Sequence, residues 1–173
     1  MEKRPKLILE LTFMDKFVEW FSWTLLLCAW IFAIVSYTTL PETIPTHFNL
    51  AGEVDAYGNK MTIFLLPLIM LVLQIGMTLL NRRPDIFNYP VKITEENVRQ
   101  QYLAATKLIR WMKLGIELIF GIIMIQVVQS AINSHTRNSA FLILGIVFVS
   151  FVPMIIYFIV ASKSTGSKKL SCS

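Results

Sequence analysis

The sequence predicts an all-α integral membrane protein with four transmembrane helices, in which residues 1–173 form a single membrane domain. Its apolar content of 55% and mean hydropathy of +0.60 are too high for a soluble domain. Four apolar runs are long enough to cross a hydrocarbon core about 30 Å thick, which takes roughly 20 helical residues. They span residues 20–40, 62–80, 114–132 and 140–161. Because lipid offers the backbone no hydrogen-bonding partner, each run is expected to be a helix.

The first apolar run is expected to stay in the membrane. It begins well inside the chain and lacks the small-x-small cleavage site of a signal peptide. The residues before it, 7–18, mix apolar side chains with Glu10, Asp15 and Lys16. This mixture is typical of a short helix at the membrane surface or of an extension of the first span.

Lysine and arginine are distributed unevenly between the two sides of the predicted membrane domain. The N-terminal segment, the three loops and the C-terminal tail carry 4, 1, 7, 1 and 3 of them in turn. Since basic residues favour the cytoplasmic side, we expect both termini and the loop 81–113 in the cytoplasm and the loop 41–60 outside the cell membrane. This topology accounts for the net charge of +5, and no motif for reading nucleic acid is present.

The outer loop, Leu40 to Lys60, reads LPETIPTHFNLAGEVDAYGNK and is rich in turn-forming residues. Its two prolines end the first helix and direct the chain along the membrane surface. The remaining turn formers predict a compact folded loop with successive tight turns: Asn49, Gly52, Asp55, Gly58 and Asn59. The loop is either a polar cap, with His47 and Asp55 bonded to each other or to local backbone N–H groups, or a small recognition or ion-binding surface.

The loop also carries the pattern L-P-x-x-I-P-x-H-F-N-x-x-G-x-x-D-x-x-G-x-K. All its fixed positions are matched: Leu40, Pro41, Ile44, Pro45, His47, Phe48, Asn49, Gly52, Asp55, Gly58 and Lys60. This pattern resembles the hallmark of the domain of unknown function 1648, found at the amino end of SdpI-type membrane proteins that give immunity to a peptide toxin. Residues 88–113 are similar to the stretch before the third span in that family. SdpI-type proteins carry further spans after this domain, whereas four spans are predicted here.

The resemblance implies a role in toxin immunity or envelope sensing, with a peptide or protein partner at the outer loop. The residues expected to bind that partner are His47, Asn49, Gly52, Asp55, Gly58 and Lys60.

The central loop predicts a basic amphipathic helix that leads into the third span. Thr94 is expected to cap a helix running from Glu95 to Lys113, with Glu95 and Glu96 favoured in its first turn by the helix dipole. The basic side chains either hold the orientation and bind anionic headgroups of membrane lipids, or dock a cytoplasmic partner.

Polar residues inside the apolar runs are few. Gln126, Gln129 and Asn133 are spaced to share one face of the third run, which we expect to face inward toward Gln74 of the second. They form either packing contacts or a polar pathway for a solute. Glu117 follows Lys113 by one turn and lies near the cytoplasmic end of the run, so we expect it to form a local ion pair or to snorkel toward the membrane surface, with a proton relay as the alternative. Pro67 and Pro153 are expected to kink their helices.

Signatures of catalysis are absent. The sequence contains no H-E-x-x-H, G-x-S-x-G, glycine-rich phosphate loop or C-x-x-C motif. Two histidines in separate loops, His47 and His135, are too few to indicate a metal, and Cys28 and Cys172 are not placed to form a disulfide. We therefore expect a protein that binds or senses without catalysis or cofactor. The alternative is a small transporter or channel component that uses the polar residues of the third run.

Overall fold

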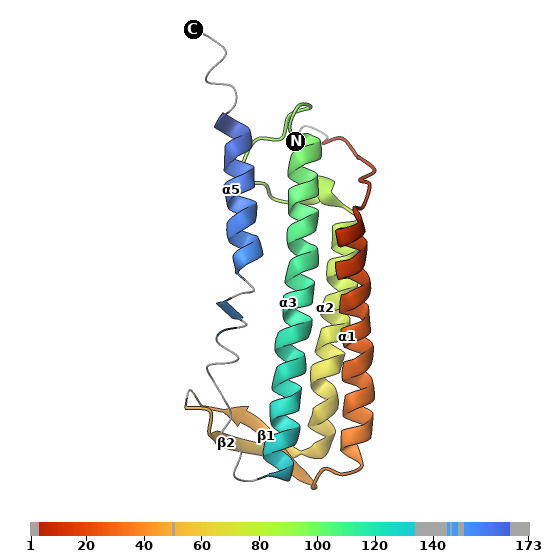
Figure 1. Cartoon of the computed structure of the whole chain (residues 1–173), viewed down its shortest axis with the longest axis vertical. Coiled ribbons are helices and arrows are strands. Elements are labelled where there is room, and N and C mark those ends of the chain that lie inside the picture. Colours follow the sequence, from red (N-terminus) through yellow and green to blue (C-terminus); the bar gives the residue numbers. More distant parts are fainter. Residues whose placement is uncertain (1–3, 50, 134–144, 146, 149–150, 167–173) are drawn as a thin grey trace.

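A computed structural model describes residues 4–49, 51–133, 145, 147–148 and 151–166. Three long helices lie side by side, and a two-stranded sheet covers one end of their bundle (Figure 1). The helices are α1 (Phe13–Tyr37), α2 (Leu65–Asn81) and α3 (Val98–Ile132). A further helix, α5 (Val152–Gly166), packs against α3. α1 and α3 run toward the sheet and α2 runs away from it (Figure 1).

Three segments among the described residues are helical, long and apolar enough to cross a membrane. They are Phe13–Tyr37, Lys60–Asn81 and Val98–Ile132, with mean hydropathies of 1.8, 2.5 and 1.9 in their most apolar parts. The protein is therefore mostly helical and has the character of a membrane protein. The predicted fourth span, 140–161, lies partly outside the described residues, and α5 covers its last part.

α1 begins seven residues before the predicted start of the first span, which supports the extension of the span over the separate surface helix. Thr12 and Asp15 form a capping box at this point. The Asp15 N–H donates to Thr12 Oγ1 at 3.2 Å, and the Thr12 N–H donates to Asp15 Oδ2 at 2.9 Å. Two backbone donors that the helix itself leaves unpaired are thereby satisfied.

α3 joins the basic lead-in and the third apolar run into one helix of 35 residues. The predicted start at Thr94 is wrong, since residues 95–97 form a turn and the helix begins at Val98. The Asn97 side chain accepts from the Thr94 N–H at 2.8 Å and donates to the Lys92 carbonyl at 2.9 Å. Asn97 thus closes a turn before the helix, and the Thr94 side chain caps nothing.

The outer loop is a β-hairpin, so the all-α prediction is wrong for this segment. β1 (Thr43–Phe48) and β2 (Val54–Asn59) pair antiparallel, with Thr43 opposite Asn59 and Phe48 opposite Val54. The register is irregular between Pro45 and Phe48. A hairpin tolerates Pro45 because each strand has only one paired edge. The prolines and glycines obscured the strand pattern in the sequence.

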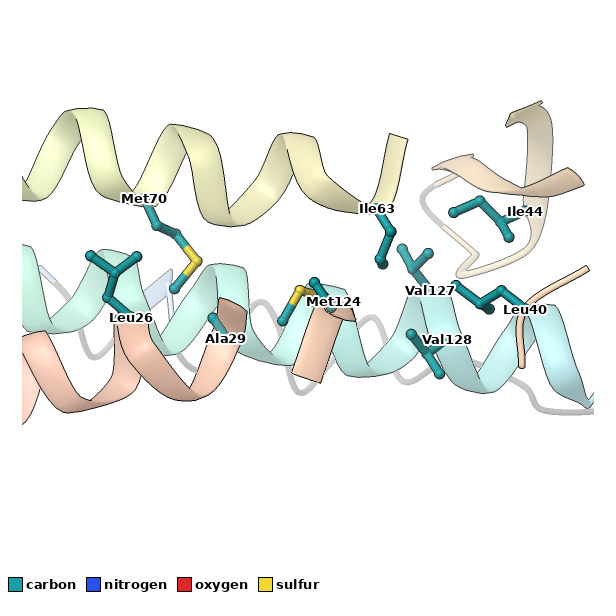
Figure 2. Packing of buried hydrophobic residues seen from close by; sticks show 10 residues of the cluster. Leu26, Ala29, Leu40, Ile44, Ile63, Met70, Met124, Val127 and Val128 are labelled. Atoms are coloured by element: carbon teal, nitrogen blue, oxygen red, sulfur yellow. The ribbon is translucent and has the colours of Figure 1, made fainter. Parts of the chain in front are cut away.

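The apolar core fills the half of the bundle next to the hairpin (Figure 2). Ile44 of β1 is 1% exposed and fixes the hairpin to Leu40, Ile63 and Val127 in this core. Ile63 belongs to η1 (Lys60–Phe64), a 3-10 helix that continues into α2. The predicted break at Pro67 therefore falls in the first turn of α2, where the helix type changes. Further from the hairpin, Leu26, Ala29, Met70 and Met124 continue the core (Figure 2).

Candidate functional site

The exposed face of the hairpin carries a histidine and an aspartate in direct contact. His47 Nδ1 lies 2.5 Å from Asp55 Oδ1, and the two side chains are 68% and 43% exposed. They come from opposite strands, so the strand pairing holds them together. This contact is one of the two local arrangements expected from the sequence. The two side chains hold each other in place and present polar atoms to the surroundings.

Asn49 organises the turn between the strands and is not part of this exposed pair. Its side-chain oxygen accepts from the Ala51 and Glu53 N–H groups at 2.9 and 3.0 Å, and its amide nitrogen donates to Glu53 Oε2 at 3.1 Å. Gly52 completes the turn with a φ of 80°, a left-handed conformation that strains any residue with a Cβ. This angle explains why glycine is favoured at position 52.

Gly58 and Lys60 hold the base of the hairpin. A Cβ at Gly58 would lie 2.8 Å from Thr46 Cγ2, so close approach of the strands requires glycine there. Lys60 Nζ donates to Glu42 at 2.9 Å and lies 4.9 Å from the centre of the Tyr37 ring. These contacts connect the second strand to the end of α1. The six residues predicted to bind thus meet in one hairpin, but four of them build it and only His47 and Asp55 form its outward face.

Tyr57 was not predicted, yet it belongs to the same exposed face. It is 67% exposed and follows Asp55 by two residues in β2. Alternate residues of a strand share one face, so the i, i+2 spacing of Asp55 and Tyr57 is the sequence signal that could have found it.

The polar face predicted for the third span does not assemble. Gln126 is buried, whereas Gln129 and Asn133 are exposed. Asn133 ends α3 with extended backbone and so leaves the helical face, and Met124, Val127 and Val128 occupy the contact side of this part of α3. Gln74 is buried at 1% exposure, and neither its nitrogen nor its oxygen has a hydrogen-bonding partner.

Charged side chains from α1 and α3 meet inside the bundle, in the half away from the hairpin. Lys113 Nζ donates to Glu19 Oε1 at 2.5 Å and to Thr78 Oγ1 at 2.8 Å. Arg110 lies 3.6 Å from Asp15 and 4.0 Å from Glu19. The sequence contained the signal, since the acids are spaced i, i+4 on α1 and the bases i, i+3 on α3.

The predicted ion pair between Lys113 and Glu117 is wrong. Lys113 pairs with α1 instead, and Glu117 is 2% exposed with Oε2 unpartnered. We use the name polar column for a set of buried and half-buried polar groups in this half of the bundle. It consists of Asp15, Glu19, Ser22, Gln74, Thr78, Arg110, Lys113 and Glu117.

The N-terminal segment lies against the connection between α2 and α3. Arg4 donates to the Phe87 carbonyl, and the Tyr102 hydroxyl donates to the Pro5 carbonyl at 3.2 Å. Nearby, Arg83 donates to both carboxylate oxygens of Asp85 at 3.0 and 2.9 Å, which lowers the pKa of that carboxyl. The basic N-terminal residues and the basic loop thus share the end of the bundle opposite the hairpin (Figure 1).

A groove of about 800 Å³ lies between the first turns of α3 and α5. It combines cationic Arg99 and Lys107 with apolar Leu103 and Ile156, and with Trp111. Within the described part of the chain, no three metal-ligating side chains gather. His135 lies outside it.

Comparison with known proteins bears on the hairpin. Residues 24–71 match the family described as Domain of unknown function (DUF1648). The resemblance of the outer loop to this domain is thereby confirmed. The match covers the second half of α1, the hairpin, η1 and the start of α2.

An uncharacterized protein of Archaeoglobus fulgidus is 35% identical to this chain over 81 residues. The alignment covers 39% of this chain and 44% of that protein, so the similarity spans less than half of the relative. No solved structure is significantly similar to this chain.

Proposed function

We propose that the protein is a non-catalytic membrane protein that recognises a peptide or protein through the exposed face of its hairpin, as a sensing or immunity-like protein. This proposal rests on one observation: one side of the hairpin is buried in the bundle and the other is exposed. Ile44 is buried in the bundle, while His47, Asp55 and Tyr57 point away from it. Only the buried side is needed to join the two helices, so the exposed side chains are free to bind a partner.

The hairpin is organised before any partner arrives. Its turn is closed by Asn49, its strands are paired, and Lys60 attaches its base to Glu42. Binding to a preformed surface avoids the entropy cost of ordering a loop, about 0.5 to 1.5 kcal/mol for each mobile side chain. Tyrosine is one of the residues enriched at protein interfaces, and Tyr57 is exposed on this surface.

The proposed topology places the hairpin outside the cell membrane and both chain termini in the cytoplasm, with four crossings. The gathering of the N-terminal segment and the basic loop at one end of the bundle supports it, because basic residues favour the cytoplasmic side. The cations of the groove, Arg99 and Lys107, would then meet anionic lipid headgroups.

The alternative of a small transporter or channel component is less well supported. It relied on Gln126, Gln129 and Asn133 lining a common path, and two of the three are exposed at the hairpin end of α3.

The test is complementation of a strain from which the gene has been deleted. A variant with His47→Ala, Asp55→Ala and Tyr57→Ala should reach the membrane in normal amount and lose the wild-type phenotype. Its matched control carries Glu10→Ala and Lys16→Ala, two exposed positions at the other end of α1, and should behave as wild type. Full activity of the hairpin variant would refute the proposal.

A photo-crosslinking residue in place of Tyr57 provides an independent measurement. It should yield a defined adduct that disappears when His47 and Asp55 are replaced. The same residue in place of Thr43, which is exposed near the base of the hairpin, serves as the positional control.

A further inference from the structure

The polar column contains an odd number of ionisable groups. Its acids are Asp15, Glu19 and Glu117, and its bases are Arg110 and Lys113. Both bases are engaged by the two carboxylates of α1. One carboxyl group, that of Glu117, is therefore left in excess inside the bundle.

Helix register places Gln74 at the same level as Glu117. Thr78 of α2 contacts Lys113 of α3 at 2.8 Å, and the two helices run in opposite directions (Figure 1). Four residues back along α2 lead to Gln74, and four residues forward along α3 lead to Glu117. Each step covers about 6 Å toward the hairpin. Both side chains are at most 2% exposed, and both carry unpartnered polar atoms.

Among the described residues, the surroundings of this level supply no cation beyond those of the polar column. From α1 comes Ser22, fully buried, whose hydroxyl donates to the Val18 carbonyl. α2 has no charged residue between Leu65 and Asn81, and Tyr157 of α5 packs beside Ala105, about three turns away along α3. On the hairpin side, the neighbouring core residues are apolar: Leu26 and Met70 come first, and Met124 lies nearer the hairpin (Figure 2). Lys113, already bonded to Glu19 and Thr78, is the nearest base along α3.

A bound proton neutralises the buried carboxylate of Glu117, and it fits the surrounding side chains better than a metal ion would. Burial without a partner disfavours the charged form of a carboxyl group. A neutral carboxyl group needs no cation beside it, which agrees with the uncharged amide of Gln74 at the same level. A metal cation would find only one carboxylate and two neutral side chains with oxygen at this level, too few for a hard cation.

We propose that the carboxyl group of Glu117 is a proton-binding site at the inner end of the polar column and holds a proton in this conformation. The paired charges of Glu19, Lys113, Arg110 and Asp15 connect it to the end of the bundle where α1 begins. This site is independent of the hairpin and of its partner.

Infrared difference spectroscopy of the full chain in lipid nanodiscs tests the proposal. At neutral pH the wild type should show the C=O stretching band of a protonated carboxyl group, and Glu117→Gln should remove it. The control, Glu10→Gln, changes an exposed carboxyl and should leave the band intact. Absence of a band that depends on Glu117 would overturn the proposal.

Two further measurements keep the test decisive. If Glu117→Gln does not accumulate, Glu117→Asp should shift the band without abolishing it, and an unchanged band would assign it to another residue. The melting temperature of the wild type should be the same in sodium and choline chloride at equal ionic strength. A rise with sodium that requires Glu117 would replace the proton by a metal cation and refute the proposal.

Discussion

Lys113 of α3 and Glu19 of α1 are joined by a hydrogen-bonded ion pair of 2.5 Å across 94 positions of sequence. Lys113 is 2% exposed and the Glu19 side chain 24% exposed. Such a pair contributes mainly by keeping a buried charge from standing alone.

Replacing Glu19 by glutamine should therefore destabilise the bundle. Removing one partner of a buried pair costs about 3 to 5 kcal/mol, and the partial exposure of Glu19 places the expected loss near the lower limit. Adding Lys113→Met should recover much of it, because no charge then stands alone. Unfolding free energies in a fixed detergent would measure both effects. Glu10→Gln is the exposed control, and equal stability of Glu19→Gln and wild type would contradict the role of the pair.

The two hairpin glycines should respond differently to a second change. Gly58→Ala places a methyl group against Thr46 Cγ2, so Thr46→Ser, which removes that atom, should restore most of the lost order. Gly52→Ala suffers from its φ of 80°, at about 1 to 2 kcal/mol, and the same second change should not relieve it. Limited proteolysis of the hairpin would separate the two cases. Rescue of both glycine variants by Thr46→Ser would disprove this explanation.

Replacing Thr12 by alanine should lower the stability of the protein more than the same replacement at Thr94. Thr12→Ala removes a side-chain cap of α1 and should lower the free energy of unfolding by about 0.5 to 2 kcal/mol. Thr94→Ala leaves its backbone contacts to Asn97 intact and should have a smaller effect. The same unfolding assay compares them directly, and the reverse order would return the helix start to Thr94.

The topology makes a prediction about access. In a chain without native cysteines, Glu53→Cys in the hairpin turn should react with an impermeant thiol reagent added to intact cells, while Lys92→Cys should react only after lysis. Both positions are exposed, so burial does not explain a difference between them. Labelling of Lys92→Cys in intact cells would invert the proposed orientation.

The connection before α3 should weaken in acid. The pKa of Asp85 is lowered by its bonds to Arg83, so their contribution is present above the ordinary aspartate value of 3.8 and is lost as the pH falls through the lower value in the folded protein. Arg83→Ala should raise the pKa of Asp85, as a carboxyl resonance in an NMR titration would show. An unchanged titration would mean that the pair does not persist in solution.

The sequence predicts the helices well because lipid leaves the backbone little choice. Residues 20–40 and 62–80 are helical over most of their length, with boundaries shifted by local capping at Thr12 and by the 3-10 start of the second segment. The hallmark of the outer loop also located the surface that the hairpin presents. The strands of this loop could not be predicted, because proline and glycine weaken the alternating pattern that indicates a strand.

Residue spacing along one helix does not predict which side chains of different helices form contacts. The i, i+4 rule offered Glu117 to Lys113, because it considers a single helix, whereas packing against α1 brought Glu19 closer. In the same way, the exposure of Gln129 depends on where the neighbouring helices lie around α3. Spacing along one helix does not contain that information.

The apolar core that extends from Leu26 and Met70 to Met124 lies between the two ends of the described bundle. It separates the hairpin from the polar column. The hairpin is connected to the Glu19–Lys113 pair through two helices: α1, which has 25 residues, is about 37 Å long and ends beside Lys60, and α3, which β1 contacts. A shift of either helix along its axis would change the distance between Glu19 and Lys113.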